Sequence, residues 1–187
     1  MEVVWEQYLA NHFRITISGF YYPIHGLISQ QVDPATRDAA FANAGSLNIR
    51  GLDFALAKSL SGGLEGTISY SFQDLANTST RTAVTNAPKH LFQASLSVPV
   101  IKQKIFASMD LQYVSSRATL AGEYAGAYIV PNFTLFTRNV LNRWEVSASL
   151  YNAFNQVYAD PAGNGLAENV LFQDGRTFRI KVGYKFQ

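Results

Sequence analysis

Apolar and polar residues alternate at every second position through much of this chain. The pattern is clearest near the carboxyl end, in residues 177–186. The apolar set there is Phe178, Ile180, Val182, Tyr184 and Phe186, and the polar set includes Arg179, Lys181 and Lys185. Because successive side chains of a β-strand point to opposite sides, the segment predicts a strand with one apolar and one polar face. Such a strand fits a soluble sandwich, or a membrane barrel whose apolar face meets lipid while its polar face lines a wet lumen; the aromatic residue at each end of the apolar row favours the membrane barrel.

The same two-residue period recurs along the rest of the chain. Apolar rows occur at Trp5 and Leu9, at Phe13, Ile15 and Ile17, at Leu52, Phe54 and Leu56, at Ile68, Tyr70 and Phe72, at Phe133 and Leu135, and within residues 92–100, 105–113 and 144–150. With the terminal segment they predict about nine strands of roughly ten residues each, the length that a tilted strand needs to cross a bilayer.

The predicted connections alternate between short and long. Short turns are expected at Ser61-Gly62-Gly63, at Lys102-Gln103-Lys104 and near Leu141-Asn142-Arg143, and long loops at residues 30–44, 74–89, 115–126 and 160–175. Outer-membrane barrels have short periplasmic turns and longer outer loops, whereas a soluble barrel or sandwich has no reason to sort its connections by length. The alternation therefore favours an all-β fold, an antiparallel up-and-down portion of a transmembrane barrel.

Composition excludes several other classes of protein. The chain has 187 residues, of which 48% are hydrophobic and 15% charged, and its mean hydropathy is −0.01. It contains no run of about 18 apolar residues, so a helical membrane protein is excluded. It has no cysteine, and its net charge of +2 is small and scattered. We therefore expect no disulfide framework, no thiolate metal site and no nucleic-acid partner.

Residues that could suggest chemistry are sparse. His12, His25 and His90 lie far apart and lack the spacing of metal ligands. Residues 160–165 resemble a turn, because the alternate carboxylates of a calcium loop are absent. No Ser-His-Asp, paired-carboxylate or phosphate-loop motif appears. We expect no enzyme activity, no cofactor and no metal site.

Six basic residues are expected to face the lumen. They are Arg14, Arg50, Arg138, Arg179, Lys181 and Lys185. Such cations can guide an anionic ligand, for example a ferric chelate; the alternative is ordinary lumen lining, in which they pair with Glu65, Asp110 and Glu145. The tyrosines expected in the interface girdles are Tyr21, Tyr22, Tyr70, Tyr113 and Tyr184, although aromatic residues of outer loops can also serve substrate binding.

Five fragments of the chain, taken in order, resemble TonB-dependent outer-membrane receptors. They are residues 43–53 (NAGSLNIRGLD), 86–90 (NAPKH), 113–117 (YVSSR), 146–161 (VSASLYNAFNQVYADP) and 173–180 (QDGRTFRI), followed by the aromatic terminal strand. The likeness runs through essentially the whole chain and identifies residues 1–187 as similar to the carboxy-terminal β-barrel segment of that family.

This resemblance implies a bacterial outer-membrane barrel of about 22 strands, closed by an amino-terminal plug domain. The family imports scarce nutrients such as ferric siderophores or cobalamin with energy transmitted by TonB. The implied partners are outer-membrane lipid and, for the full-length protein only, the TonB complex and a ferric chelate or cobalamin-like ligand. The chain departs from the family in its strand number, in lacking the plug and in ending on Gln187 after Phe186.

The start MEVVWEQYL lacks the basic leader and apolar core of a signal peptide, so we expect a piece of a longer protein.

About nine strands leave two unpaired edges, which cost several kcal/mol per unpaired backbone group in lipid. An isolated piece is expected to refold, to dimerise through its edges or to close into a smaller barrel, and not to transport. Two alternatives remain open: a small complete outer-membrane barrel of structural, adhesive or enzymatic type, and a soluble ligand-binding barrel.

Overall fold

The computed structural model describes residues 1–9, 12–32, 39–60, 62–78, 83–101, 104–138, 143–163 and 165–186, without the side chains of residues 29–44. These residues form one nine-stranded antiparallel sheet and two small two-stranded sheets within its connections. The predicted all-β class and the number of strands are confirmed. No helix in this part of the chain is long and apolar enough to cross a membrane.

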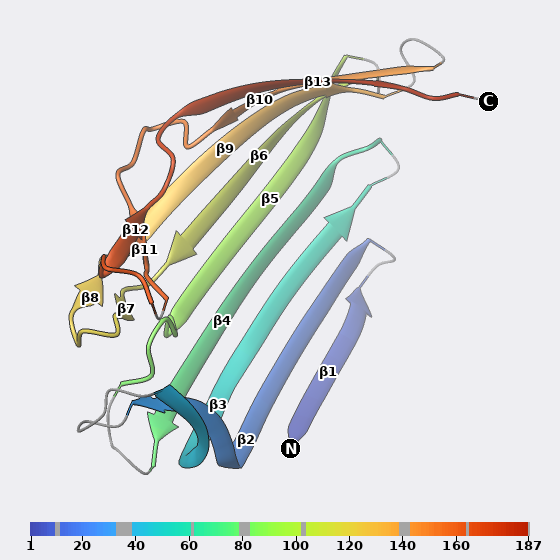
Figure 1. The fold of residues 1–187 in the computed structure, drawn as a ribbon. Coiled ribbons are helices and arrows are strands. Elements are labelled where there is room, and N and C mark those ends of the chain that lie inside the picture. Colours follow the sequence, from blue (N-terminus) through green and yellow to red (C-terminus); the bar gives the residue numbers. More distant parts are fainter. Residues whose placement is uncertain are drawn as a thin grey trace.

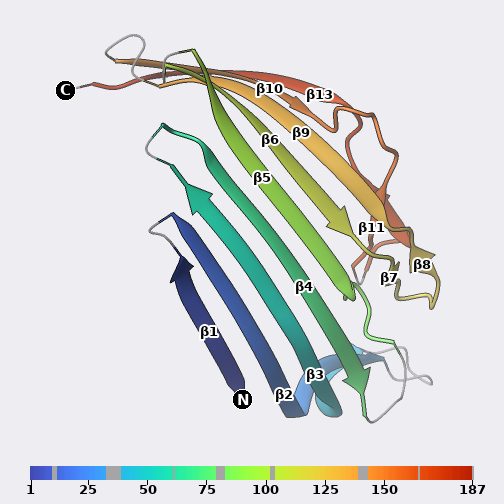
Figure 2. The same cartoon turned by 180° about the vertical axis from the view of Figure 1, so that it is seen from behind.

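The main sheet is an up-and-down meander in which each strand pairs with its neighbour in the chain. Its strands are β1 (Glu2–Leu9), β2 (Phe13–Val32), β3 (Ala39–Ser59), β4 (Glu65–Asn77), β5 (His90–Ile101), β6 (Ile105–Val114), β9 (Tyr128–Thr137), β10 (Trp144–Tyr151) and β13 (Thr177–Tyr184). The small sheets are β7 (Arg117–Ala118) with β8 (Tyr124–Ala125), and β11 (Ala159–Pro161) with β12 (Val170–Phe172). Figures 1 and 2 show a single curved layer whose edge strands, β1 and β13, do not meet. The barrel is therefore open.

The expected loop at residues 30–44 is wrong for most of its length. β2 continues to Val32 and β3 begins at Ala39, and these two residues pair with each other. Residues 33–38 lie outside the described part of the chain. β2 and β3 therefore have 20 and 21 residues, twice the expected length. The physical reason is that a two-residue hydrophobic period reports a difference between the two faces of a strand, so a paired strand without that difference escapes detection.

The predicted short turns join strands that end at one common edge of the sheet. Ser59 pairs with Glu65, and Ile101 pairs with Ile105. Ser61, Lys102, Gln103, Leu141 and Asn142 themselves lie outside the described residues. The other three predicted long loops lie at the opposite edge, where two of them contain the small sheets. The sorting of short and long connections is therefore confirmed for the long connections that follow β4, β6 and β10, and it fails between β2 and β3, where only residues 33–38 separate the two strands.

Strand pairing keeps the two faces of the sheet consistent from β2 to β9. One row of direct partners is apolar and runs through Ile17, Phe54, Tyr70, Phe92, Tyr113 and Ile129. The adjacent row, one residue away on each strand, runs through Thr16, Ala55, Ser69, Gln93, Gln112 and Val130. We call the first surface the apolar face and the second the polar face. The register places each predicted apolar row on the same side.

The apolar face is uncovered. On β13 the side chains of Phe178, Ile180 and Val182 are 64%, 62% and 58% exposed, and no second layer of the described residues packs on them. A water-soluble sandwich would bury such a face against another sheet. An exposed apolar surface of this extent instead marks contact with a membrane or another protein. The soluble alternative therefore has no support in the fold.

Gly51 of β3 shows how closely the sheet is packed on its polar face. Its direct partner on β2 is Phe20, whose ring lies across the glycine. A Cβ at Gly51 would lie 2.4 Å from the carbonyl oxygen of Phe72 and 2.5 Å from Cζ of Phe20. Only a residue without a side chain leaves this space for the aromatic ring.

Candidate functional site

A junction built on Arg117 joins three of the long connections. Its Nη1 donates to Oδ1 of Asn86 at 3.2 Å, and its Nη2 donates to Oδ1 of Asp160 at 2.6 Å and to the carbonyl oxygen of Ala159 at 3.3 Å. The side chain of Arg117 is only 8% exposed. Asn86 comes from the β4–β5 connection, Arg117 from the β6–β9 connection and Asp160 from the β10–β13 connection. One guanidinium therefore ties together loops that are far apart in the sequence.

An apolar cluster supports this junction from the polar face. Val114, Tyr128 and Val130 are buried together, and Leu91 and Tyr158 pack against them. The rings of Tyr128 and Tyr158 lie 4.4 Å apart, and the Arg117 guanidinium lies 5.5 Å from the Tyr128 ring. Burial raises the pKa of Tyr158 above its ordinary value, and the carboxylates of Asp160 and Asp174 add to this effect. Tyr158 thus contributes as a neutral aromatic residue.

Asn152 holds the end of β10 against the start of β13. Its side-chain Oδ1 accepts from the Gln156 amide at 2.8 Å, and its Nδ2 donates to the carbonyl oxygens of Gln156 at 2.8 Å and Asp174 at 3.2 Å. The residue is 2% exposed and has a φ of 46°, a left-handed conformation that asparagine tolerates better than most residues. Asn152 therefore satisfies three backbone groups in a tight turn.

Asn155 adds a further hydrogen bond between the turn after β10 and the segment before β13. It also has a positive φ, and its Oδ1 accepts from the Arg176 amide at 2.9 Å. A Cβ at Gly175 would lie 2.8 Å from the same oxygen, so a larger residue there would displace the Asn155 side chain from this position. The fragments NAFN and DGR, which resemble the receptor family, are thus two halves of one hydrogen-bonded structure.

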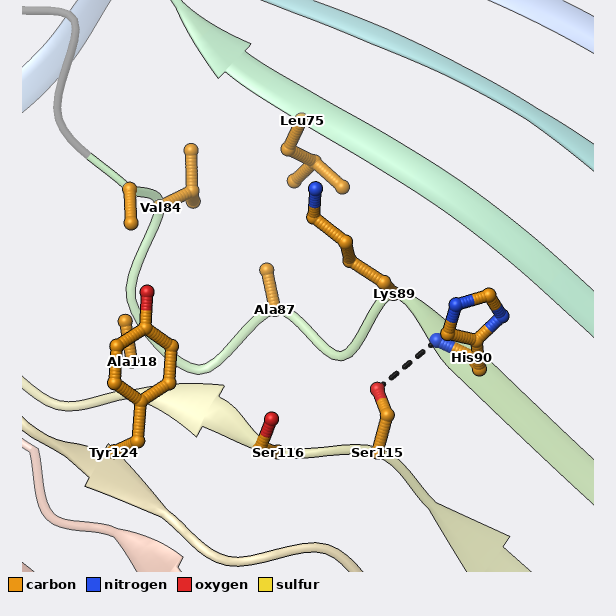
Figure 3. Close-up of a pocket in the computed structure, with 10 residues that line it drawn as sticks. Leu75, Val84, Ala87, Lys89, His90, Ser115, Ser116, Ala118 and Tyr124 are labelled. Carbon is orange, nitrogen blue, oxygen red and sulfur yellow. Dashed lines mark hydrogen bonds between the residues drawn. The ribbon is translucent and has the colours of Figure 1, made fainter.

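A small pocket of about 190 Å³ lies between the β4–β5 and β6–β9 connections. Figure 3 shows Ala87 in its middle, with Lys89 on one side and Tyr124 on the other, and the bond of 3.0 Å from the His90 amide to Oγ of Ser115. Its lining is mainly apolar, and the ammonium of Lys89 lies 3.2 Å from Asp74. Within the described residues, no group of three His, Cys, Asp or Glu side chains could hold a metal ion.

Five of the six predicted basic residues share the polar face. Arg14 pairs with Ala57 and belongs to the row that continues through Thr67, Ser95 and Asp110. Arg179 and Lys181 lie on this face of β13, and Lys185, the residue after the strand, contacts Glu145 of the same face. Arg138 follows β9 on the side of Thr134 and Phe136. Their role in guiding a ligand stays a prediction.

The expected position of Arg50 is wrong. Its direct partners are Tyr21 and Asp74, which places it on the apolar face with Leu52 and Phe54. The reason is the strict period of two: Arg50 precedes Leu52 by two residues, and no bulge interrupts this part of β3. Its Nη2 lies 2.8 Å from Oδ2 of Asp74.

The alternative interpretation, in which basic residues pair with acidic neighbours, is correct for two positions. Arg138 lies 3.4 Å from Glu65, and Lys185 lies 2.5 Å from Glu145. Asp110 instead accepts a hydrogen bond from Ser95. Arg14 and Lys181 make no ion pair with any residue in the described ranges, and Arg179 lies 5.2 Å from the ring of Tyr151. Arg14 and Lys181 thus lack a direct ion pair there, although the acidic residues Glu6, Asp53 and Glu145 share the polar face with them.

Four of the five predicted girdle tyrosines lie on the apolar face. They are Tyr21, Tyr70, Tyr113 and Tyr184. Tyr22 does not: it alternates with Tyr21, lies on the polar face and donates to Glu2 at 2.6 Å.

Of the histidines, His90 bonds to the Tyr70 hydroxyl at 2.8 Å and His25 approaches Ser46 at 3.4 Å.

Comparison with known proteins places the chain in a family. The family model described as TonB dependent receptor-like, beta-barrel, matches residues 1–155. No curated protein matches the chain. The copper transporter OprC is similar in structure, with a TM-score of 0.77 and 18% identity over 99% of this chain and 30% of that one.

Two iron proteins are similar to the same degree. The FrpB iron transporter from Neisseria meningitidis has a TM-score of 0.76 and 18% identity, over 99% of this chain and 30% of that one. The ferric-catecholate import receptor Fiu from K12 E. coli has a TM-score of 0.75 and 17% identity, over 99% and 27%. The chain thus spans less than a third of the length of these solved proteins, and at such identities the likeness shows the fold alone.

Proposed function

Because the chain belongs to the TonB-dependent receptor β-barrel family, we propose that it forms part of the wall of a bacterial outer-membrane importer of a scarce nutrient, a ferric siderophore or a similar metal chelate. The rest of the barrel, the plug domain and the segment that contacts TonB then belong to the remainder of a longer protein. Outer-membrane lipid covers the apolar face, and the polar face lines the path of the ligand.

The observation that carries this proposal is the division of the sheet into an exposed apolar face and a polar face on which both basic and acidic side chains lie. Arg14 and Lys181 lie on the polar face without an ion pair among the described residues, and Arg179 lies beside a hollow of about 290 Å³ lined by Tyr151, Tyr158 and Gln173. Uncompensated cations raise the local concentration of an anionic ligand and its association rate. A ferric chelate made of three catecholates carries a net negative charge, so it is the kind of ligand that these cations would attract.

The similar structures support the substrate class without defining it. FrpB is an iron transporter, Fiu imports ferric catecholates and OprC transports copper. Transport or import of a metal is common to all three names. Nothing in the described strands, which form an open sheet, favours the alternative of a small complete barrel with a structural or adhesive role.

Uptake of radioactive iron by cells that carry the full-length protein tests the proposal. Wild type is expected to take up a ferric siderophore only when TonB is present. The triple variant Arg14→Gln, Arg179→Gln, Lys181→Gln is expected to bind the chelate more slowly and with a weaker dependence on salt, because the steering charge is removed. Lys58→Gln, on the apolar face, serves as the matched control and should behave as wild type. Uptake that is independent of TonB, or a triple variant with unchanged association, contradicts the proposal.

A further inference from the structure

A charged cluster lies at the edge of the apolar face near the long loops: Arg50 and Asp74 belong to that face, and the ammonium of Lys89, a residue opposite Gln73, reaches Asp74 from the start of β5. Arg50 of β3 donates to Oδ2 of Asp74 through Nε at 3.2 Å and through Nη2 at 2.8 Å. Lys89, which precedes β5, places its ammonium 3.2 Å from the other oxygen of the same carboxylate. The two cations share one anion, so the cluster of Arg50, Asp74 and Lys89 keeps a net positive charge.

Arg50 and Lys89 keep hydrogen-bond donors that the contact with Asp74 does not use. Arg50 and Lys89 are 71% and 65% exposed, whereas Asp74 is 23% exposed. Nη1 of Arg50 makes no hydrogen bond to the described residues, and the Lys89 ammonium has three N–H donors for one carboxylate oxygen. Both cations therefore retain donors directed away from Asp74. Guanidinium and ammonium groups held side by side form a suitable site for a phosphate group.

The position of the cluster along β3 matches the boundary of a membrane. Arg50 and Lys58 both lie on the apolar face, with Leu52, Phe54 and Leu56 between them. Eight residues extend about 26 Å along a strand, or roughly 20 Å across the bilayer at the usual tilt of a barrel strand. This is close to the height of about 25 Å of the apolar band of an outer-membrane barrel. The two charges thus bracket the lipid-covered band.

Aromatic residues mark the same boundary. Tyr21 is the direct neighbour of Arg50 on β2, and the rings of Phe72 and His90 lie 5.3 Å apart beside Asp74. Tyrosine and other aromatic side chains concentrate at the level of lipid headgroups. Lys58, at the opposite boundary, lies 4.5 Å from the Phe13 ring. The long-loop end of the sheet is the outer end in a barrel of this type.

We propose that Arg50 and Lys89, positioned by Asp74, bind a phosphate group of an anionic lipid in the outer leaflet of the membrane. The inference rests on the proposed outer-membrane location and is independent of the transported nutrient. Free phosphate offers the same chemistry, but the continuity of the cluster with the exposed apolar face favours a lipid, whose acyl chains cover Leu52, Phe54 and Phe72 while its headgroup meets the cations.

Lipid retention by the full-length protein tests this site. The protein is placed in nanodiscs of phosphatidylcholine that contain a minor fraction of bis-phosphorylated lipid A, and the lipid that remains bound after transfer to detergent is counted by native mass spectrometry. Arg50→Gln and Lys89→Gln are each expected to lower retention about fivefold, and the double variant more strongly. Lys58→Gln, on the same face at the opposite boundary, is expected to retain lipid as wild type does.

A variant that is expected to bind more lipid distinguishes loss of the site from misfolding, because a misfolded protein would not gain lipid. Asp74→Asn removes the competing anion and leaves both cations, so it should retain more lipid A than wild type. Equal retention by the double variant and wild type, an equal loss in Lys58→Gln, or displacement of the lipid by millimolar inorganic phosphate would each overturn the proposal. Iron uptake and membrane fractionation of the same variants keep the outcome separate from that of the proposed function, because lipid loss with normal uptake concerns this site alone.

Discussion

The guanidinium Nη2 of Arg117 lies 2.6 Å from Oδ1 of Asp160, although 43 residues separate them in the sequence. Arg117 is almost completely buried, and about a third of the Asp160 side chain is exposed. The pair also holds Asn86, so it fixes three connections at the end of the sheet where they emerge. Residues of the fragments NAPKH, YVSSR and VSASLYNAFNQVYADP, which resemble the same family, meet in this junction.

Replacement of Arg117 by methionine is expected to destabilise this junction. The substitution keeps an unbranched side chain but removes the bonds to Asn86, to the Ala159 carbonyl and to Asp160, which keeps the 3.5 Å bond from the Tyr128 hydroxyl. The expected cost is about 2–4 kcal/mol, toward the lower end of the range for a buried pair because about a third of the Asp160 side chain is exposed. Thermal unfolding of the full-length protein in detergent, with limited proteolysis of the loops, measures the effect. Arg138→Met is the control, since its ion pair with Glu65 is half exposed and contributes little. Equal losses in both variants would show that burial of Arg117 has no special weight.

Asn152→Ala should lower the free energy of unfolding by about 2–3 kcal/mol, since three hydrogen bonds are lost and alanine is strained at positive φ. Chemical unfolding in urea is the measurement. Asn152→Gly loses the same three side-chain hydrogen bonds but is not strained at positive φ, so its stability is expected to fall between those of wild type and the alanine variant. Stability equal to that of wild type in both variants is incompatible with the hydrogen-bonding role of Asn152.

Gly51→Ala should destabilise the sheet by about 1–3 kcal/mol, because the new methyl group meets a backbone oxygen and the Phe20 ring. Gly62→Ala is the matched control: no atom lies within 4 Å of a Cβ at that position. Heat modifiability in gel electrophoresis and the unfolding temperature report the difference. The packing interpretation fails if the two alanine variants are equally stable.

Phe54→Arg and Ala55→Arg place the same charge on adjacent residues and opposite faces of β3. In lipid, arginine near the middle of the apolar band costs about 2–4 kcal/mol, whereas a residue that faces a wet lumen accepts it. Phe54 lies midway between Arg50 and Lys58, so the first substitution is expected to reduce folding into vesicles and the second to leave it nearly unchanged. The reverse order would assign the apolar face to the interior of the barrel.

Most of the sheet could be predicted from the chain alone, because two faces in two different media require residues that alternate strictly. The segment of residues 177–186 is predicted correctly for this reason. Arg50 and Tyr22 were assigned to faces by their chemical type, and both assignments failed because the position along the strand decides the face. Arg50 is two residues from Leu52 and therefore lies on the apolar face, as Leu52 does. Tyr22 is next to Tyr21, which lies on the apolar face, and therefore lies on the polar face. The extension of β2 and β3 through residues 30–32 and 39–44 left no alternating pattern to detect.

The amino-acid sequence by itself determined that this chain forms strands and which face of most strands is apolar. It also determined where most of the short and long connections fall. These features depend on neighbours one or two residues apart. Only the tertiary structure decided that Asn86, Arg117 and Asp160 meet, that Asn152 reaches the Asp174 carbonyl, and that Arg50 and Lys89 share Asp74. Those contacts depend on the register between strands and on the path of the loops, which bring distant residues together through backbone pairing and leave no periodic trace in the chain.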